Sequence, residues 1–160
     1  MAEANVIDSF SGRYRLLSNF YPCRIVFFGK IWPSSEHLFQ ALKTNDEASR
    51  RRIQCAPRPV QAKHLGRHVK LRPDWEEIKE NVMRTVVQAK FQQNSNLMEK
   101  LLQTGELVLV EGNDWHDNVW GNCSCPRCKN IEGENRLGRI LMDLREEFRK
   151  QRQKKEACGL

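Results

Sequence analysis

The chain has 160 residues, with 27 Lys and Arg against 20 Asp and Glu, 39% hydrophobic residues and six cysteines. A chain of this length buries about 70% of the surface that its unfolded form exposes, so we predict a single compact domain whose core is large enough to hold a cleft. The longest apolar runs, such as residues 25–28, fall far short of the about 18 residues that a membrane span requires, which argues against a transmembrane protein.

The first eight residues include two acids and have neither the basic nor the apolar region of a secretion signal, so we expect a cytoplasmic protein. The cysteines are too sparse and uneven for a secreted disulfide framework. The net charge of +7 favours polyanionic partners, although much of the excess lies in residues 50–52 and 149–155. A solvated helix face and a frayed tail are the common interpretations of such runs.

The chain begins with short extended pieces at residues 6–7 and 23–28, and a turn at residues 29–30 returns the second piece as a small antiparallel hairpin. A Ser followed by Glu36 predicts the start of a helix that reaches residue 44. Two shorter helices follow at residues 46–55 and 59–66.

Asp74 is predicted to cap the longest helix, because apolar residues recur behind it at helical spacing: Trp75, Ile78, Val82, Val86 and Ala89. A helix at residues 95–104, a strand at 106–111 and a last amphipathic helix through residue 148 complete a mainly helical α+β fold. We divide the chain into a domain at residues 1–148 and a basic tail at 149–160. The intervening loop at residues 112–133 is unusually long, which favours a functional role.

Lys90 falls inside the apolar arc of the long helix. Its amine must either extend out along its methylene groups, which geometry alone favours, or lie desolvated as a better nucleophile. Lys79 lies at a similar angle, so the helical wheel does not single out Lys90. Glu36, Gln40 and Lys43 share one stripe of their helix, for which an exposed polar face is the common interpretation.

The long loop places Asp117 beside Trp115 and Trp120, where aromatic rings can sandwich a base and raise the pKa of a carboxyl group for acid–base work. A loop held by two hydrophobic anchors is an equal alternative. Cys123, Cys125 and Cys128 supply three thiols, whereas structural zinc takes four ligands. His116 or Cys55 completes such a site only if the fold brings one close, so we favour reduced thiols and predict no cofactor, with structural zinc as the weaker alternative.

Seven segments in order make the chain similar to a known family: residues 17–22, 32–43, 89–91, 102–105, 109–111, 117–121 and 133–142. The chain thereby resembles the YbiA-like family, also called NADAR, from about residue 10 to residue 145. The resemblance implies an α+β, mainly helical fold. It also implies N-glycosidase activity, either on phosphoribosylamino-pyrimidine intermediates of riboflavin synthesis or on ADP-ribosylated guanine in DNA. The segment that contains Cys123, Cys125 and Cys128 is an insertion that departs from the family pattern.

The resemblance reassigns several residues. It implies that Glu36, Lys90 and Asp117 are catalytic, and that Ser18, Asn19, Phe20, Trp120 and Asn135 contact substrate, to which we add Trp75. In both implied substrates, ribose C1′ is joined to an exocyclic amine of a guanine-like base. We expect Lys90 to attack C1′ and form a Schiff base, while Glu36 moves protons and Asp117 orients the ribose or activates water. Direct attack by water is the alternative mechanism.

The implied partner is a phosphorylated ribosyl or ADP-ribosyl substrate, which extends to DNA that carries ADP-ribosylated guanine. We expect no membrane partner. Two other interpretations belong to different classes of protein. A non-catalytic module that binds ADP-ribose or a related nucleotide has no need of a nucleophile beside carboxylates. A basic nucleic-acid-binding domain predicts salt-sensitive DNA binding without a modified base.

Overall fold

The computed structural model describes residues 5–159, which form two compact units. One unit consists of residues 19–95, here called the middle unit, and the other of the residues before and after it, here called the terminal unit. Residues 1–4 lie outside the described residues. The predicted domain begins there, and so does the segment that was examined for a secretion signal. Within residues 5–159, no helix has both the length and the apolar character that crossing a membrane requires.

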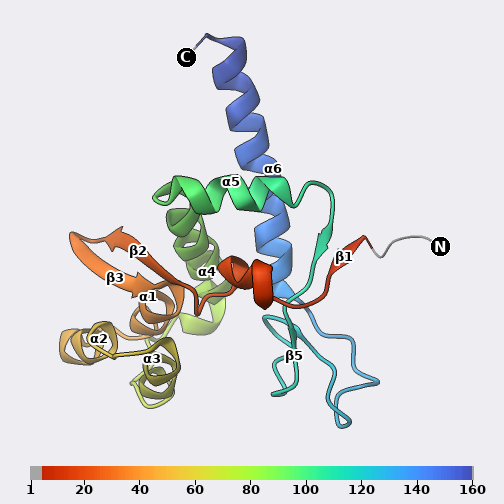
Figure 1. Ribbon diagram of the computed structural model, residues 1–160. Coiled ribbons are helices and arrows are strands. Elements are labelled where there is room, and N and C mark those ends of the chain that lie inside the picture. Colours follow the sequence, from red (N-terminus) through yellow and green to blue (C-terminus); the bar gives the residue numbers. More distant parts are fainter. Residues whose placement is uncertain (1–4, 160) are drawn as a thin grey trace. The chain divides into compact units, whose positions relative to one another are not determined.

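The middle unit consists of one hairpin and four helices (Figure 1). Their bounds are β2 (Pro22–Phe27), β3 (Lys30–Ser34), α1 (Ser35–Ala41), α2 (Glu47–Gln54), α3 (Pro59–Gly66) and α4 (Trp75–Gln92). The hairpin is antiparallel and pairs Ile25 with Trp32 and Phe27 with Lys30, which confirms the predicted antiparallel pairing. All four predicted helices of this unit are present, with small shifts at their ends.

Local signals start three of these helices. The Ser34 hydroxyl accepts a hydrogen bond from the His37 amide, and the Asp46 carboxylate accepts one from the Ser49 amide. Pro59 occupies the first position of α3, where its missing N–H costs nothing. Asp74 does precede α4, but its carboxylate binds the Arg72 guanidinium at 2.6 Å, so the predicted side-chain cap is wrong.

Helix α1 lies at the centre of the middle unit and packs against α2, α3 and α4. Every residue of α1 is buried. The surrounding core is apolar and contains Ile25, Trp32, Leu38, Ala41, Leu42, Ile53, Ala56, Ala62 and Val86. Because neighbours cover α1 on all sides, the exposed polar face that spacing suggested for Glu36 and Gln40 is absent from these described residues.

The terminal unit holds short strands and two further helices. Their bounds are β1 (Val6–Ile7), the 3₁₀ helix η1 (Gly12–Leu17), α5 (Ser95–Gln103), β4 (Val108–Leu109), β5 (Gly112–Asn113), β6 (Asn122–Cys123) and α6 (Arg136–Ala157). Strands β1 and β4 pair in parallel, as do β5 and β6. The helical turn η1 corrects the expectation that the first thirty residues are extended, and the predicted strand at 106–111 shrinks to two residues.

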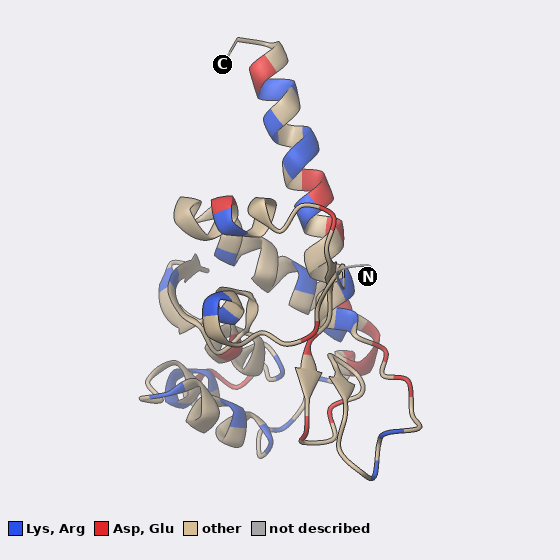
Figure 2. Cartoon of the chain, turned by 45° about the vertical axis from the view of Figure 1, so that its right-hand side comes forward, with Lys and Arg blue, Asp and Glu red and all other residues tan. Residues whose placement is uncertain are grey.

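Helix α6 has 22 residues, so it and not α4 is the longest helix. It runs across the predicted boundary at residue 148 without a break, and Lys and Arg occupy many positions of its later part (Figure 2). The expected tail is helical as far as Ala157, and ion pairs join its first residues to neighbouring segments of the same unit. Arg149 binds Glu106 at 2.6 Å, and Arg152 binds Glu99 of α5 at 2.6 Å.

Candidate active site

Lys90 is the most deeply buried charged residue of the predicted site, with 1% of its surface exposed. Its amine lies 5.2 Å from the centroid of the Phe91 ring and 5.9 Å from that of Tyr21. Burial lowers the pKa of Lys90 to about 8, and the nearby Cys23 opposes this shift only in part. The lysine therefore does not extend to solvent, and its amine is available in the neutral, nucleophilic form near physiological pH.

Glu36 lies in the first turn of α1 and is 6% exposed. Its carboxylate accepts a hydrogen bond of 2.6 Å from the Gln40 amide, and its backbone N–H donates to the Asn19 carbonyl at 3.0 Å. Gln40 is itself pressed against Gly66 of α3, where an added Cβ would lie 1.9 Å from the Gln40 side-chain oxygen. A close approach of two helices thus fixes the position of the carboxylate.

Lys43 lies within electrostatic range of this carboxylate and of two further cations. Burial lowers the pKa of Lys43, Glu36 opposes the shift, and Lys63 and Arg67 add to it. The Lys63 amine also lies 5.7 Å from the ring centroid of Phe20. Sequence reasoning named Lys43 only as part of a polar stripe and missed the other two cations, because α3 meets α1 only through the tertiary fold.

The predicted substrate-binding residues of the middle unit differ in accessibility. Asn19 is 6% exposed and donates to the Met83 sulfur at 3.3 Å, whereas Phe20 is 38% exposed. Trp75 is 5% exposed, and its ring centroid lies 5.2 Å from that of Phe39. Phe20 is therefore the aromatic ring of this group that is open to a ligand, and substrate contact by Trp75 stays a prediction.

Two buried acceptors in the middle unit are unsatisfied. Within the described residues, no group donates a hydrogen bond to the side-chain oxygen of Asn19 or to that of Gln40. Buried polar atoms nearly always have partners, so an unsatisfied pair next to a fixed carboxylate indicates a place for donors from a ligand or from water.

Asp117 and Trp120 lie in the terminal unit, in the long loop. One carboxylate oxygen of Asp117 accepts hydrogen bonds from the amides of Val119 at 3.1 Å and Trp120 at 2.9 Å. The buried side chain of Asn113 accepts from the Asp117 amide at 3.1 Å and donates to its carbonyl at 2.7 Å. These bonds hold Asp117 and Trp120 in one turn, and their contact with substrate stays a prediction.

Asn135 and Ser18 also belong to the terminal unit. The Asn135 side chain accepts from the Glu111 amide at 3.0 Å and donates to the Leu109 carbonyl at 2.9 Å. Its φ of 48° lies in the left-handed region, directly before α6. Asn135 thus ties the start of α6 to strand β4, a structural role that sequence reasoning did not consider. Ser18 closes η1 with a backbone bond of 3.0 Å to Arg15.

Four potential metal ligands meet in the long loop. The ligand atoms of His116, Cys123, Cys125 and Cys128 all lie within 4.8 Å of one another. The sequence supplied the three thiols, and the fold adds the imidazole.

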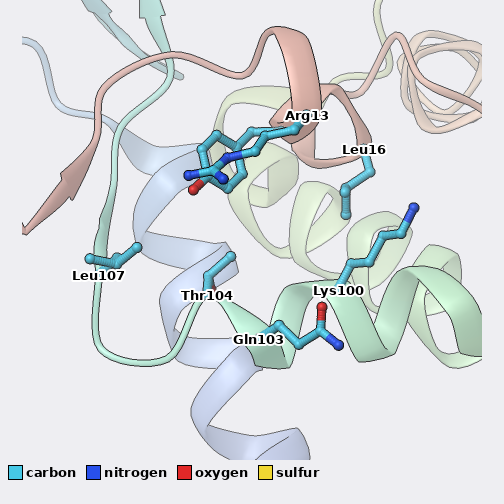
Figure 3. Close-up of a pocket in the computed structure, with 7 residues that line it drawn as sticks. Arg13, Leu16, Lys100, Gln103, Thr104 and Leu107 are labelled. Atoms are coloured by element: carbon cyan, nitrogen blue, oxygen red, sulfur yellow. The ribbon is translucent and has the colours of Figure 1, made fainter.

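A cavity of about 540 Å³ opens in the terminal unit (Figure 3). Its lining comes from η1, α5 and the turn after α5, and consists of Arg13, Tyr14, Leu16, Lys100, Gln103, Thr104 and Leu107. Arg13 and Lys100 make it suitable for an anionic group. None of the residues predicted to carry chemistry is among those that line it, so we assign it no role in the reaction.

Comparison with known proteins identifies relatives over most of the chain. The profile of the NADAR domain matches residues 8–149. The N-glycosidase YbiA of Escherichia coli is 42% identical over 142 residues, which cover 88% of this chain and 85% of that protein. A riboflavin biosynthesis protein of Vibrio vulnificus is 42% identical over 134 residues, which cover 82% of this chain and 35% of that protein.

The solved NMR structure of E. coli YbiA matches with a TM-score of 0.80 and 39% sequence identity, over 95% of this chain and 89% of that one. This match confirms the predicted mainly helical α+β fold. The names of the relatives support the predicted class of enzyme, a hydrolase that cleaves N-glycosidic bonds. The extent of the profile match and the identity to YbiA show that this chain belongs to the NADAR family.

Proposed function

We propose that this protein hydrolyses the bond between ribose C1′ and the exocyclic amine of a guanine-like base. The substrate is either a phosphoribosylamino-pyrimidine intermediate of riboflavin synthesis or guanine that carries ADP-ribose. The names of the relatives support an N-glycosidase, and two of them are riboflavin biosynthesis proteins of Vibrio vulnificus and Zea mays. The roles of Lys90 and Glu36 rest on the geometry of the middle unit, and the role of Asp117 rests on the family resemblance.

The observation that carries the proposal is the environment of Lys90. Lys90 is 1% exposed and its pKa is lowered to about 8, so its burial costs the fold free energy, because burial disfavours the charged form. A fold that accepts this cost favours a function for the amine. A neutral amine of this kind is suited to attack a carbonyl-like carbon.

The surroundings of Glu36 support a polar, phosphorylated substrate. The unsatisfied oxygens of Asn19 and Gln40 are suited to accept hydrogen bonds from ribose hydroxyls or from an amino group. Lys43, Lys63 and Arg67 are suited to a phosphate. The exposed Phe20 ring is suited to stack on a base.

The proposed reaction consumes one water molecule and forms no lasting bond to the protein. The glycosylamine first opens at the ring oxygen to give an imine at C1′, with Glu36 supplying a proton. The Lys90 amine adds to C1′, and the base leaves as its free amine, which leaves a Schiff base on Lys90. Water then adds to C1′, releases the lysine and gives the free sugar. We assign Asp117 the role of orienting the ribose or activating this water.

Product analysis by mass spectrometry tests the substrate. The purified protein is offered, in parallel, a guanine-ADP-ribosylated DNA oligonucleotide and the phosphoribosylamino-pyrimidine precursor. Release of the unmodified oligonucleotide identifies a de-ADP-ribosylating enzyme, and release of ribose 5-phosphate identifies a metabolite glycosidase. Binding of either compound without turnover would instead favour the non-catalytic nucleotide-binding module.

Borohydride trapping tests the mechanism. Reduction during turnover converts a Schiff base into a stable amine, so we expect a ribosyl adduct on the peptide that contains Lys90 and none in a Lys90→Ala variant. Near-normal turnover by Lys90→Ala would refute the covalent route and leave direct attack by water, with Glu36 or Asp117 as base.

A further inference from the structure

The loop at residues 112–133 folds without a hydrophobic core of its own. Its buried residues are Asn113, Gly121, Cys123 and Cys128, of which none is a large apolar side chain. Trp115 and Ile131 are 57% and 54% exposed, and Trp120 is only half-buried. Of the two tryptophans considered as hydrophobic anchors, Trp115 therefore does not act as one, and the half-buried Trp120 provides only partial packing.

Little regular structure stabilises the loop. Strands β5 and β6 have two residues each and pair Gly112 with Asn122 and Asn113 with Cys123. Segments that cannot bury enough apolar surface commonly depend on a disulfide or a structural metal. All six cysteines of this chain are free thiols, so a disulfide does not fill that role.

The side chains that converge instead are metal ligands. The Nδ1 atom of His116 lies 3.2 Å from the Cys125 sulfur and 3.5 Å from the Cys128 sulfur. Zinc bonds of about 2.0–2.3 Å in a tetrahedron place neighbouring ligand atoms about 3.5–3.8 Å apart. The observed cluster, all within 4.8 Å, is therefore close to the size of a tetrahedral zinc site with one nitrogen and three sulfur ligands.

The backbone also favours this arrangement. His116 adopts a φ of 69°, a strained conformation for a residue with a side chain, in the turn that directs its imidazole toward the cysteines. Its amide donates to the Cys123 sulfur at 3.3 Å, and the Cys123 amide donates to Asn118 at 2.9 Å. Hydrogen bonds to ligand atoms of this kind orient metal ligands. The spacing of Cys125 and Cys128, with two residues between them, is also common in zinc sites.

We propose that His116, Cys123, Cys125 and Cys128 bind one structural zinc ion that fixes the loop at residues 112–133. Four protein ligands close the coordination sphere, so the ion holds the loop together and has no open position for a substrate. Because Asp117 follows His116 directly, the metal also fixes the turn that contains Asp117. The site does not depend on the proposed N-glycosidase activity, whose nucleophile Lys90 and proton donor Glu36 lie in the middle unit. It reverses our sequence-based preference for reduced thiols, for which the position of His116 was unknown.

Metal analysis of the full chain tests this site. The protein is purified without chelator and with a reductant, and zinc is measured by mass spectrometry against protein concentration. We expect about one zinc ion per chain in the wild type. Cys128→Ser should lose most of the metal, whereas Cys55→Ser, which removes an exposed thiol in the middle unit, should keep it. His116→Ala provides a second ligand variant in case Cys128→Ser does not fold.

Cobalt substitution provides a readout independent of activity and of the variants. Co²⁺ added to chelator-treated wild-type protein should produce the intense visible absorption of tetrahedral cobalt and a near-ultraviolet band from thiolate ligands. Equimolar zinc should then abolish both bands. Metal-free wild-type protein that shows no such spectrum, or a Cys125–Cys128 disulfide in the reduced preparation, would overturn the proposal. Neither readout requires turnover.

Discussion

The middle unit and the long loop of the terminal unit position polar groups by opposite means. Lys90 and Glu36 are buried in a unit with an apolar core, and the cost of burying the lysine appears in its lowered pKa. In the loop at residues 112–133, hydrogen bonds with the backbone hold Asp117 next to the His116 and cysteine cluster, while Trp115 and Ile131 are exposed.

This difference indicates a reactive role for the middle unit and a structural role for the polar network of the loop. Burial changes the reactivity of an ionisable group, because the loss of water destabilises its charged form more than its neutral form. Hydrogen bonds and metal ligands fix the geometry of a segment that has little hydrophobic core. The polar atoms that form these bonds are then engaged in holding the segment together. We therefore expect the middle unit to carry the reactive groups and the loop to depend on its polar network for shape.

The largest expected effect comes from removing the Lys90 amine. Lys90→Met keeps an unbranched apolar side chain that is only one atom shorter, so we expect kcat/KM to fall about a thousandfold or more while the fold is kept. The melting temperature should stay level or rise, because a desolvated amine is replaced by an apolar group.

Lys79→Met is the matched control for Lys90→Met. Lys79 lies on the same helix and pairs with Glu76 on its surface, so this variant should keep near-normal kcat/KM. Equal losses in the two variants would show that the effect comes from α4 in general and not from the buried amine.

Glu36→Gln should have the next largest effect. The amide keeps the size of the side chain but cannot transfer a proton, so we expect kcat to fall about a hundredfold or more. Glu47→Gln, which removes an exposed carboxylate on α2, should change kcat by less than about twofold. Comparable kinetics of the two variants would remove Glu36 from the proton-transfer role.

The pH profile should follow the amine of Lys90. Its pKa is lowered to about 8, so the neutral form dominates above that pH and the protonated form below it. We expect kcat/KM to rise with pH and level off above about 8, with a slope of about tenfold per pH unit on the acid side. Steady-state kinetics from pH 6 to 10 measure this, and a profile that declines from pH 7 to 9 would contradict a neutral nucleophile.

Gly66→Ala should perturb the middle unit through packing alone. The new methyl group would overlap the Gln40 side chain, which holds the Glu36 carboxylate, so we expect a loss of about 2 kcal/mol in the free energy of unfolding. Urea unfolding measures this. The loss should shrink in a Gln40→Ala background, and strictly additive effects would show that the two residues do not compete for the same space.

Asn113→Ala should have a smaller, local effect in the loop. It removes the side-chain bonds to Trp115 and Asp117, so we expect a cost of about 1–2 kcal/mol. Amide hydrogen exchange should show lost protection at Asp117 and unchanged protection in α4. An equal loss of exchange protection in the loop and in α4 would contradict the expectation that the two regions are stabilised independently.

Several elements could be predicted from the sequence because their causes are local. Ser34 and Asp46 mark helix starts by bonds that span three residues, and Pro59 marks one by its missing N–H. The hairpin followed from a turn signal between two apolar segments. The ordered family segments likewise identified Lys90 and Glu36 as candidates, although helical geometry alone favoured exposure for both.

Tertiary structure decided the features that depend on neighbours from distant parts of the chain. Helices α2, α3 and α4 bury α1, and only this enclosure turns Glu36 from a surface residue into a fixed carboxylate. The imidazole of His116 reaches the thiols through a left-handed backbone conformation that no spacing rule predicts. The sequence by itself therefore determined which residues are chemically suitable, whereas the fold decided which of them are desolvated or brought together, because burial and proximity depend on long-range packing.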